Sequence, residues 1–262
     1  MRPALKGPEL SVAIERTVVI TGAASGIGAA TARRLAAPGT GLLLTTRANV
    51  DGLAAAADAA RAAGATVETM LGDLTDEATA AALVATARER FGRIDGIVSN
   101  AGKAAKAKVA DIAGEDVLGA ARLAALPFLA LANAARADLI ASPAGRIVAV
   151  SSFVANDFGI NGTLFPATAA GKAALEALVK ALAFELAPTG VTVNAVAPGF
   201  TRKDGGHAAL GPEAWAAAAK ATPSGRIAEP QDIAAAIAFF LSAEAGHVTG
   251  QVLRVDGGLS LL

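Results

Sequence analysis

The feature that most constrains this 262-residue chain is a regular alternation of short β-branched runs with long alanine-rich stretches. Val and Ile favour strands, whereas Ala and Leu favour helices, so propensity and pattern agree. The runs are almost continuously apolar, as strands covered by helices on both faces require. Seven strands are predicted, at Thr17–Thr21, Leu42–Thr46, Thr66–Met70, Gly96–Ser99, Arg146–Ser151, Val191–Val196 and Gln251–Val255.

Helices are expected between these strands, at Gly26–Ala37, Gly52–Ala63, Asp76–Phe91, Glu115–Leu139, Leu164–Ala187 and Gln231–Ser242. This order predicts an α/β fold with a single Rossmann-like, doubly wound parallel sheet of about seven strands and helices on both faces. No linker or repeat divides the chain, so we expect one dinucleotide-binding domain over residues 1–262, with an N-terminal extension at 1–15.

One glycine-rich segment, Arg202–Pro223, stands outside the alternation and contains the only Trp and one of the two His residues. Function-bearing loops often project from a rigid scaffold, so we interpret residues 202–223 as a flap over a substrate site. The alternative is a solvated excursion that contains one short helix.

Composition excludes several kinds of protein. The absence of cysteine excludes disulfides, a thiolate nucleophile and Cys-based zinc sites. Equal numbers of basic and acidic residues, 23 of each, argue against a general nucleic-acid binder. The longest apolar run, Ile233–Leu241, is too short to span a bilayer, and Met1–Ser11 lacks a signal-peptide core. We therefore expect a soluble cytoplasmic protein that binds neither nucleic acid nor membrane.

The segment Thr21–Gly28 (TGAASGIG) follows the first strand and opens the first helix. Its glycines would let the backbone turn sharply and approach a pyrophosphate, and the helix N-terminus would offer unpaired N–H groups and a positive dipole. The context therefore favours a dinucleotide site over a simple tight turn.

The end of the second strand bears on the choice of cofactor. An acidic residue there would bind the ribose hydroxyls of NAD, but the strand ends in Thr45-Thr46-Arg47. A guanidinium suits the 2′-phosphate of NADP, so we expect NADP(H), with NAD(H) as the alternative. The alternatives are that Arg47 stacks on the adenine or points to solvent, and in either case it would not select NADP(H).

Eight motifs occur along the chain in a fixed order. They are TGAASGIG (Thr21–Gly28), GDLTD (Gly72–Asp76), SNAG (Ser99–Gly102), GRIVAVSS (Gly145–Ser152), GKAALEAL (Gly171–Leu178), NAVAPGFT (Asn194–Thr201), GRIAEPQDIA (Gly225–Ala234) and TGQVLRVDGG (Thr249–Gly258). In this order the sequence resembles the short-chain dehydrogenase/reductase family over essentially its whole length.

The resemblance implies hydride transfer between a nicotinamide and a carbonyl or alcohol carbon, with Ser152 and Lys172 as catalytic residues. It also implies a homotetramer or homodimer that packs through the two long helices and the C-terminal strand. The cofactor contacts that we expect are Gly22, Ser25, Gly26, Ile27, Gly28, Arg47, Asp73, Leu74, Asn100, Ala101, Gly102, Lys172, Pro198, Gly199 and Thr201.

The chain departs from the family in its proton-handling residues. The family's catalytic tyrosine stands four residues before the lysine; here that position is Thr168, and the chain contains no tyrosine. The family's helical asparagine is also missing from its slot near Arg122–Ala125. A threonine hydroxyl is shorter and far less acidic than a phenol, whose ordinary pKa is about 10. Because acid–base help is typically worth about 10²–10⁴-fold, we expect an altered proton relay. In this relay Thr168 takes the place of the tyrosine as the third catalytic residue, beside Ser152 and Lys172.

Several groups are candidates to replace the tyrosine. Lys103 follows the SNAG turn directly and is the favoured one, because a lysine there would donate a proton or bind an anionic substrate. Each candidate also has an ordinary structural explanation as a surface charge or a turn cap. The others are Lys106, Lys108, Asp157 and His207, whereas His247 is expected to be structural.

Three functions remain open at this stage. The first is an NADP(H)-dependent oxidoreductase that interconverts a small carbonyl and an alcohol with an altered proton relay. The second is a cofactor-binding structural or regulatory subunit without dehydrogenase activity. The third is a non-redox lyase, isomerase or dehydratase on the same fold, because a fold does not fix its chemistry.

Overall fold

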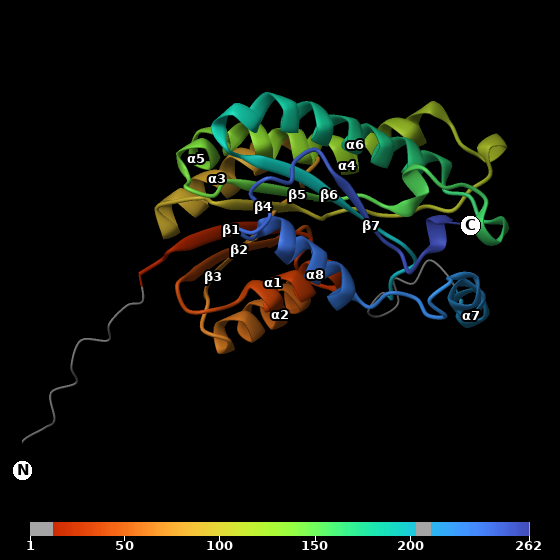
Figure 1. Ribbon diagram of the computed structural model, residues 1–262, viewed down its shortest axis with the longest axis horizontal. Helices are drawn as coiled ribbons and strands as arrows, with labels where there is room; N and C mark the ends of the chain where they lie inside the picture. Colours follow the sequence, from red (N-terminus) through yellow and green to blue (C-terminus); the bar gives the residue numbers. More distant parts are fainter. Residues whose placement is uncertain (1–12, 203–210, 262) are drawn as a thin grey trace, which may run out of the picture.

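All seven strands run parallel in one sheet, whose order is β3-β2-β1-β4-β5-β6-β7. The computed structural model describes residues 13–202 and 211–261 (Figure 1). The strands are β1 (Arg16–Thr21), β2 (Thr40–Thr46), β3 (Thr66–Leu71), β4 (Gly96–Ser99), β5 (Arg146–Val150), β6 (Thr192–Pro198) and β7 (Val252–Val255). The predicted doubly wound parallel sheet is confirmed.

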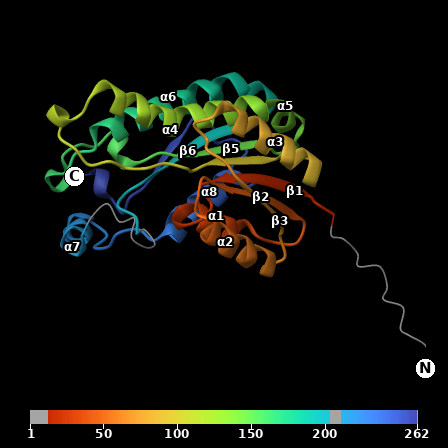
Figure 2. The ribbon, with the colours of Figure 1, turned by 180° about the vertical axis from the view of Figure 1, so that it is seen from behind.

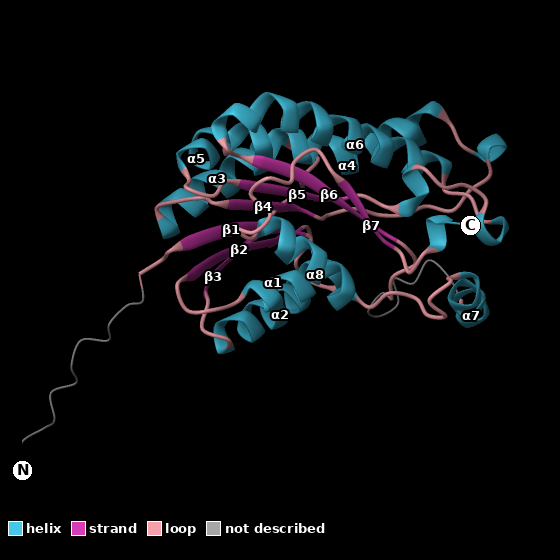
Figure 3. Ribbon diagram, in the orientation of Figure 1, coloured by secondary structure: helices cyan, strands magenta, loops and turns pink. Residues whose placement is uncertain are grey.

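Helices cover the sheet in two layers, which Figures 1 and 2 show from opposite sides and Figure 3 shows by element type. One layer contains α1 (Gly26–Leu35), α2 (Val50–Ala62) and α8 (Pro230–Leu241). The other contains α3 (Glu77–Phe91), α4 (Gly114–Ala134), α5 (Arg136–Ala141) and α6 (Pro166–Leu186). A further helix, α7 (Pro212–Ala221), lies away from both layers, near the C-terminal end of the chain.

The apolar strands supply a separate core to each layer. Val18 and Ile20 pack with Phe240 of α8 on one face, whereas Val19 packs with Phe128 of α4 on the other. All five side chains are essentially inaccessible to solvent. A continuous apolar run is therefore required in a central strand, because alternate residues bury their side chains on opposite faces.

The prediction that every strand is covered on both faces is wrong for the two edges of the sheet. β3 and β7 each have several exposed or partly exposed side chains, because helices cover the faces of these edge strands only in part. The single helix expected at Glu115–Leu139 is also wrong, because the chain leaves helical geometry at Ala135 and divides into α4 and α5.

Helix α4 is long and apolar enough, by length and composition alone, to cross a membrane. In this fold it packs lengthwise against α6 and α3, and it buries Phe128 and Leu131 in the core. Its apolar character is thus accounted for by helix packing, as in the core helix of any α/β domain.

The strand order reverses between β1 and β4, whose following connections lead to opposite faces of the sheet. In open parallel sheets such a reversal leaves a crevice at the carboxyl ends of the strands, where ligands bind. Thr21 ends β1 and Ser99 ends β4, so the TGAASGIG and SNAG motifs meet at this point.

Candidate active site

The turn after β1 is built from glycines that leave no room for a side chain. Gly22 has a φ of +63°, and a Cβ there would lie 2.9 Å from Nδ2 of Asn100. A Cβ on Gly28 would collide with the carbonyl oxygen of Gly22. The first turn of α1 therefore lies directly against the loop, and backbone N–H groups border the crevice.

The end of β4 is tied to this loop by hydrogen bonds. The side-chain amide of Asn100 donates to the carbonyls of Thr21 (2.9 Å) and Gly22 (3.1 Å). The hydroxyl oxygen of Thr21 accepts from the backbone N–H groups of Asn100 (2.9 Å) and Ala101 (3.1 Å). These bonds bring Gly22, Asn100 and Ala101 together at the switch in strand order.

The N-terminus of α1 faces the same crevice. Ser25 is its N-cap residue and is exposed, and its side chain caps no N–H of the described chain. Gly26, with a φ of +52°, and Ile27 form the first helical positions. A helix start whose cap hydroxyl is not used internally suits an anion such as a pyrophosphate.

Arg47 and Asp73 meet beyond the ends of β2 and β3. Their charged groups lie 3.9 Å apart, and the Arg47 side chain is 71% exposed. Asp73 accepts hydrogen bonds from the backbone N–H and the hydroxyl of Thr75, and these bonds lower the pKa of its carboxyl. The exposed ion pair is weak, so Arg47 is free to turn toward another anion. Leu74 is partly buried and packs against the core.

Lys172 lies in the interior where β4, β5 and α6 converge. Its ammonium donates to the carbonyl of Val150 at 2.6 Å, and a Cβ on Gly102 would lie 3.4 Å from its Nζ. Burial lowers the pKa of Lys172 to about 8, and the negative charge of Glu176 opposes part of this shift. Lys172 is thus a buried amine whose pKa is well below that of an exposed lysine.

Thr168 lies one helical turn before Lys172 and is also buried. Its hydroxyl oxygen accepts a hydrogen bond from the N–H of Ala105 at 3.1 Å. The carbonyl of Leu164 accepts a second bond, from the N–H of Ala107. In the tyrosine slot, therefore, the side chain fastens the segment that follows the SNAG turn to the start of α6.

Ser152 begins the loop after β5 and is partly buried, with its hydroxyl oxygen 3.4 Å from the N–H of Val154. Beside this loop is an apolar pocket, whose lining includes Phe153, Phe158, Phe165 and Phe200. The rings of Phe153 and Phe200 have centroids 4.9 Å apart. The lining of the pocket therefore begins at Phe153, the residue that follows Ser152.

Pro198 ends β6, and Gly199 follows it beside the last strand, where a Cβ on Gly199 would lie 2.8 Å from Asp256. The hydroxyl of Thr201 donates to the carbonyl of Gly199 at 3.1 Å. Thr201 also forms a parallel bridge with Ala228, which joins the NAVAPGFT and GRIAEPQDIA motifs.

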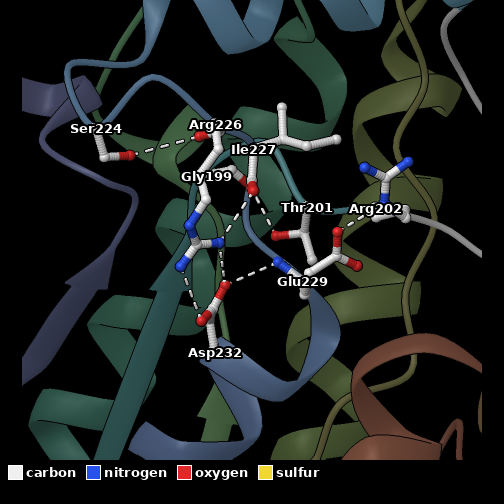
Figure 4. A network of polar contacts seen from close by, with 8 residues as sticks. All are labelled: Gly199, Thr201, Arg202, Ser224, Arg226, Ile227, Glu229 and Asp232. Carbon is white, nitrogen blue, oxygen red and sulfur yellow. Dashed lines mark hydrogen bonds and ion pairs between the residues drawn. The ribbon is translucent and has the colours of Figure 1, made fainter.

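Ion pairs hold the base of the predicted flap, as Figure 4 shows. Arg202 pairs with Glu229 at 2.7 Å, and Arg226 pairs with Asp232 at 2.6 Å. Both acidic residues stand in the first turn of α8 or just before it. Of the flap itself, Arg202 and residues 211–223 are described, and α7 lies within them; residues 203–210 fall outside the described residues.

The residues predicted as replacements for the tyrosine differ in their exposure and in their ion pairs. Asp157 pairs with Arg254 at 3.0 Å, which makes it a structural ion pair. Lys103, Lys106 and Lys108 are exposed and have no acidic partner within the described residues. His247 is exposed, and His207 lies outside the described residues. The asparagine slot near Arg122–Ala125 holds buried Ala124 and Ala125.

Three residues of this site, Glu176, Ser151 and Asn156, are not among those predicted from the sequence. The buried Glu176 accepts hydrogen bonds from the Ser151 hydroxyl and the Asn156 side chain. A carboxylate four residues after Lys172, within an otherwise apolar helix face, was the available signal, because both positions share one face of α6.

Known proteins match this chain over almost its whole length. The family model described as enoyl-(acyl carrier protein) reductase matches residues 22–260. The chain belongs to the short-chain dehydrogenase/reductase family. It is an oxidoreductase of the short-chain type, and the members of this family use NAD(P).

Two relatives and one solved structure illustrate the likeness. The chain is 38% identical to cis-4-hydroxycyclohexanecarboxylate dehydrogenase of Sinomonas cyclohexanicum, over 93% of this chain and 96% of the relative. It is 33% identical to the 3-oxoacyl-[acyl-carrier-protein] reductase FabG of Escherichia coli, over 94% and 98%. A candidate NAD(P)-dependent gluconate 5-dehydrogenase from Beutenbergia cavernae, with NADP bound at low occupancy, superposes with a TM-score of 0.85, 34% identity and coverage of 96% and 99%.

The bond between Thr168 and Ala105 gives a testable expectation. Thr168→Val keeps the shape of the side chain but removes the acceptor, so amide hydrogen exchange should quicken across residues 103–108. Hydrogen–deuterium exchange followed by mass spectrometry measures this change. Thr163→Val, on the neighbouring loop, is the matched control and should leave that segment unchanged. Equal exchange in Thr168→Val and the parent would contradict the fastening role.

Proposed function

We propose that this chain is an NADP(H)-dependent oxidoreductase that interconverts a small carbonyl and an alcohol with an altered proton relay. The supporting observation is the tight glycine cradle at Gly22 and Gly28, which opens onto the same crevice as Lys172 and Ser152. A backbone that would clash with any Cβ leaves its N–H groups close to a ligand, and this fits a pyrophosphate.

The chain's residues divide into binding and reacting groups in this proposal. The cofactor supplies or accepts the hydride when bound. The N–H groups of Ser25, Gly26 and Ile27 bind its phosphates, while Asp73 and Leu74 bound the adenine. Asn100, Ala101 and Gly102 line the middle of the crevice, and Lys172, Pro198, Gly199 and Thr201 line the nicotinamide end.

Ser152 would donate its hydroxyl hydrogen to the substrate oxygen, and this bond would polarise the carbonyl as negative charge develops on the oxygen. The adjoining pocket, with Phe153 and Phe200 side by side, suits an apolar part of a small substrate. Exposed Lys103, without an acidic partner among the described residues, suits an anionic substituent.

The choice of NADP(H) rests on Arg47. This side chain lies at the end of β2, is largely exposed, and makes one weak contact with Asp73. No carboxylate ends this strand, so the ribose hydroxyls lack the acceptor that would select NAD(H).

A second function, a cofactor-binding protein without dehydrogenase activity, is favoured by Thr168. Its hydroxyl oxygen is occupied by the Ala105 N–H, and an aliphatic alcohol is a poor acid in place of a phenol. In that case the cradle would bind the nucleotide while the reaction itself did not occur.

We further propose one domain over residues 1–262, with residues 202–223 as the substrate flap, in a cytoplasmic homotetramer or homodimer. Exposed apolar side chains on the two long helices, Leu118 and Leu126 of α4 and Phe184 of α6, support pairing through those helices.

The experiment for the proposed activity is a spectroscopic screen. Purified protein should oxidise NADPH, seen as loss of nicotinamide absorbance, with small ketones and oxo acids, at a rate about 10²–10⁴-fold below a reaction with full acid–base help. Thr168→Tyr should raise the rate, and Ser152→Ala should lower it. Binding of NADPH without turnover in either the parent or Thr168→Tyr would favour the second function.

The cofactor preference has its own test. NADPH should bind more tightly than NADH by fluorescence titration, because the 2′-phosphate gains a charge-assisted contact with Arg47. Arg47→Ala should erase this preference. Arg61→Ala, which removes an exposed arginine on α2, is the control and should retain it. Equal affinities of the parent protein for NADPH and NADH would contradict the role of Arg47.

A further inference from the structure

The site contains a buried carboxylate that the proposed reaction does not use. Glu176 lies on α6 and is 6% exposed. Its Oε1 accepts a hydrogen bond from the Ser151 hydroxyl at 2.5 Å, and its Oε2 accepts one from the Asn156 side-chain amide at 3.0 Å. A buried carboxylate is costly unless it is hydrogen-bonded, and here each oxygen has a donor.

The two donors stand on either side of Ser152. Ser151 immediately precedes it and is fixed to the sheet, because its N–H donates to the carbonyl of Val196 at 2.7 Å. Asn156 follows the 3₁₀ helix Phe153–Ala155. Glu176 therefore fastens both ends of the short loop that begins with Ser152 to helix α6.

The same carboxylate shares a helix face with Lys172, one turn away. The ammonium of Lys172 donates to the carbonyl of Val150, the last residue of β5 before this loop. No ion pair joins Lys172 and Glu176 directly among the described residues, since each group is bonded to the β5 end instead. The loop of Ser152, Lys172 and Glu176 are thus joined through hydrogen bonds to the end of β5 and the loop after it.

We propose that Glu176 is a positioning residue, whose carboxylate holds the Ser152 loop against α6 and supplies the negative charge that keeps Lys172 an ammonium at the nicotinamide end of the crevice. The role at the nicotinamide end rests on the proposed function.

The charges around Lys172 support this assignment. Burial favours the neutral amine and lowers the pKa of Lys172 to about 8, whereas Glu176 raises it. From α4, the backbone of Ala120 and Ala121 packs against Gly171. From the SNAG turn, Gly102 adjoins Nζ, and Lys103 beyond it is exposed. In the loop after β5, Asp157 is paired with Arg254. Glu176 is therefore the charge that stabilises the ammonium.

Two substitutions separate the charge from the hydrogen bonds. Glu176→Gln keeps the size of the side chain and an acceptor for Ser151, but it removes the negative charge. Ser151→Ala removes one hydrogen bond and keeps the charge. Each variant changes the attachment of the Ser152 loop to α6, but only Glu176→Gln removes the charge, so a difference in the Lys172 midpoint between them reports the charge.

The measurement is an NMR titration of the protein labelled with ¹³C at the lysine ε-carbons, with the Lys172 signal assigned by its absence in Lys172→Arg. In the parent, this signal should titrate with a midpoint near pH 8. In Glu176→Gln, the midpoint should shift to lower pH, because the ammonium has lost its stabilising charge. In Ser151→Ala, the midpoint should stay close to that of the parent. An unchanged midpoint in Glu176→Gln would overturn the proposal.

The link to the cofactor is tested by fluorescence titration of NADPH across the same pH range. Affinity in the parent should weaken as pH rises through the Lys172 midpoint, and in Glu176→Gln this loss should begin at lower pH. Affinity that is independent of pH in both proteins would overturn the role at the nicotinamide end. Failure of NADPH to bind the parent at any pH would reject the proposed function, while the NMR titration would still decide the charge on Lys172.

Discussion

The crevice depends on the hydrogen bonds that join the ends of β1 and β4. The Thr21 hydroxyl and the Asn100 side chain each bridge the two strands, and together they fix the glycine turn against the SNAG turn. Because the strand order reverses here, helices on opposite faces diverge from this join and leave the carboxyl edge of the sheet open. The other site residues are placed by the strands on either side of it.

Two halves of the site follow different rules. The proposed nucleotide half is formed by backbone geometry, which is set by glycines that admit no Cβ and by the start of a helix. The proposed proton-handling half consists of side chains, and Thr168 stands there at the position where the family resemblance predicts a tyrosine. Thr168 accepts a hydrogen bond from a neighbouring segment, and burial lowers the pKa of Lys172 to about 8. Glu176 is hydrogen-bonded on both sides of Ser152 and lies one helical turn from Lys172, so both positions that we propose as catalytic adjoin one carboxylate.

The alternation of strands and helices was predictable from the sequence. Buried strands such as β4 and β5 were predicted almost to the residue, because their apolar runs are dictated by helices on both faces. The edge strands β3 and β7 were predicted from similar runs of residues, although several of their side chains are exposed. The break between α4 and α5 at Ala135 was not predictable, because no glycine or proline stands at that position. The contact of Thr168 with Ala105, and the bonds of Glu176, join residues 20 or more positions apart, so they follow from the fold and have no local pattern.

The central claim is that the glycine cradle at the β1–β4 join binds a dinucleotide. The dissociation constant of NADPH for Gly28→Ala tests it most directly, because this Cβ would meet the Gly22 carbonyl and force the loop out of position. Gly119→Ala is the matched control, since a Cβ there meets nothing within 4 Å. The account predicts that Gly28→Ala, still folded by circular dichroism, loses most of its affinity while Gly119→Ala binds as the parent does. Parent-like affinity in Gly28→Ala would contradict it.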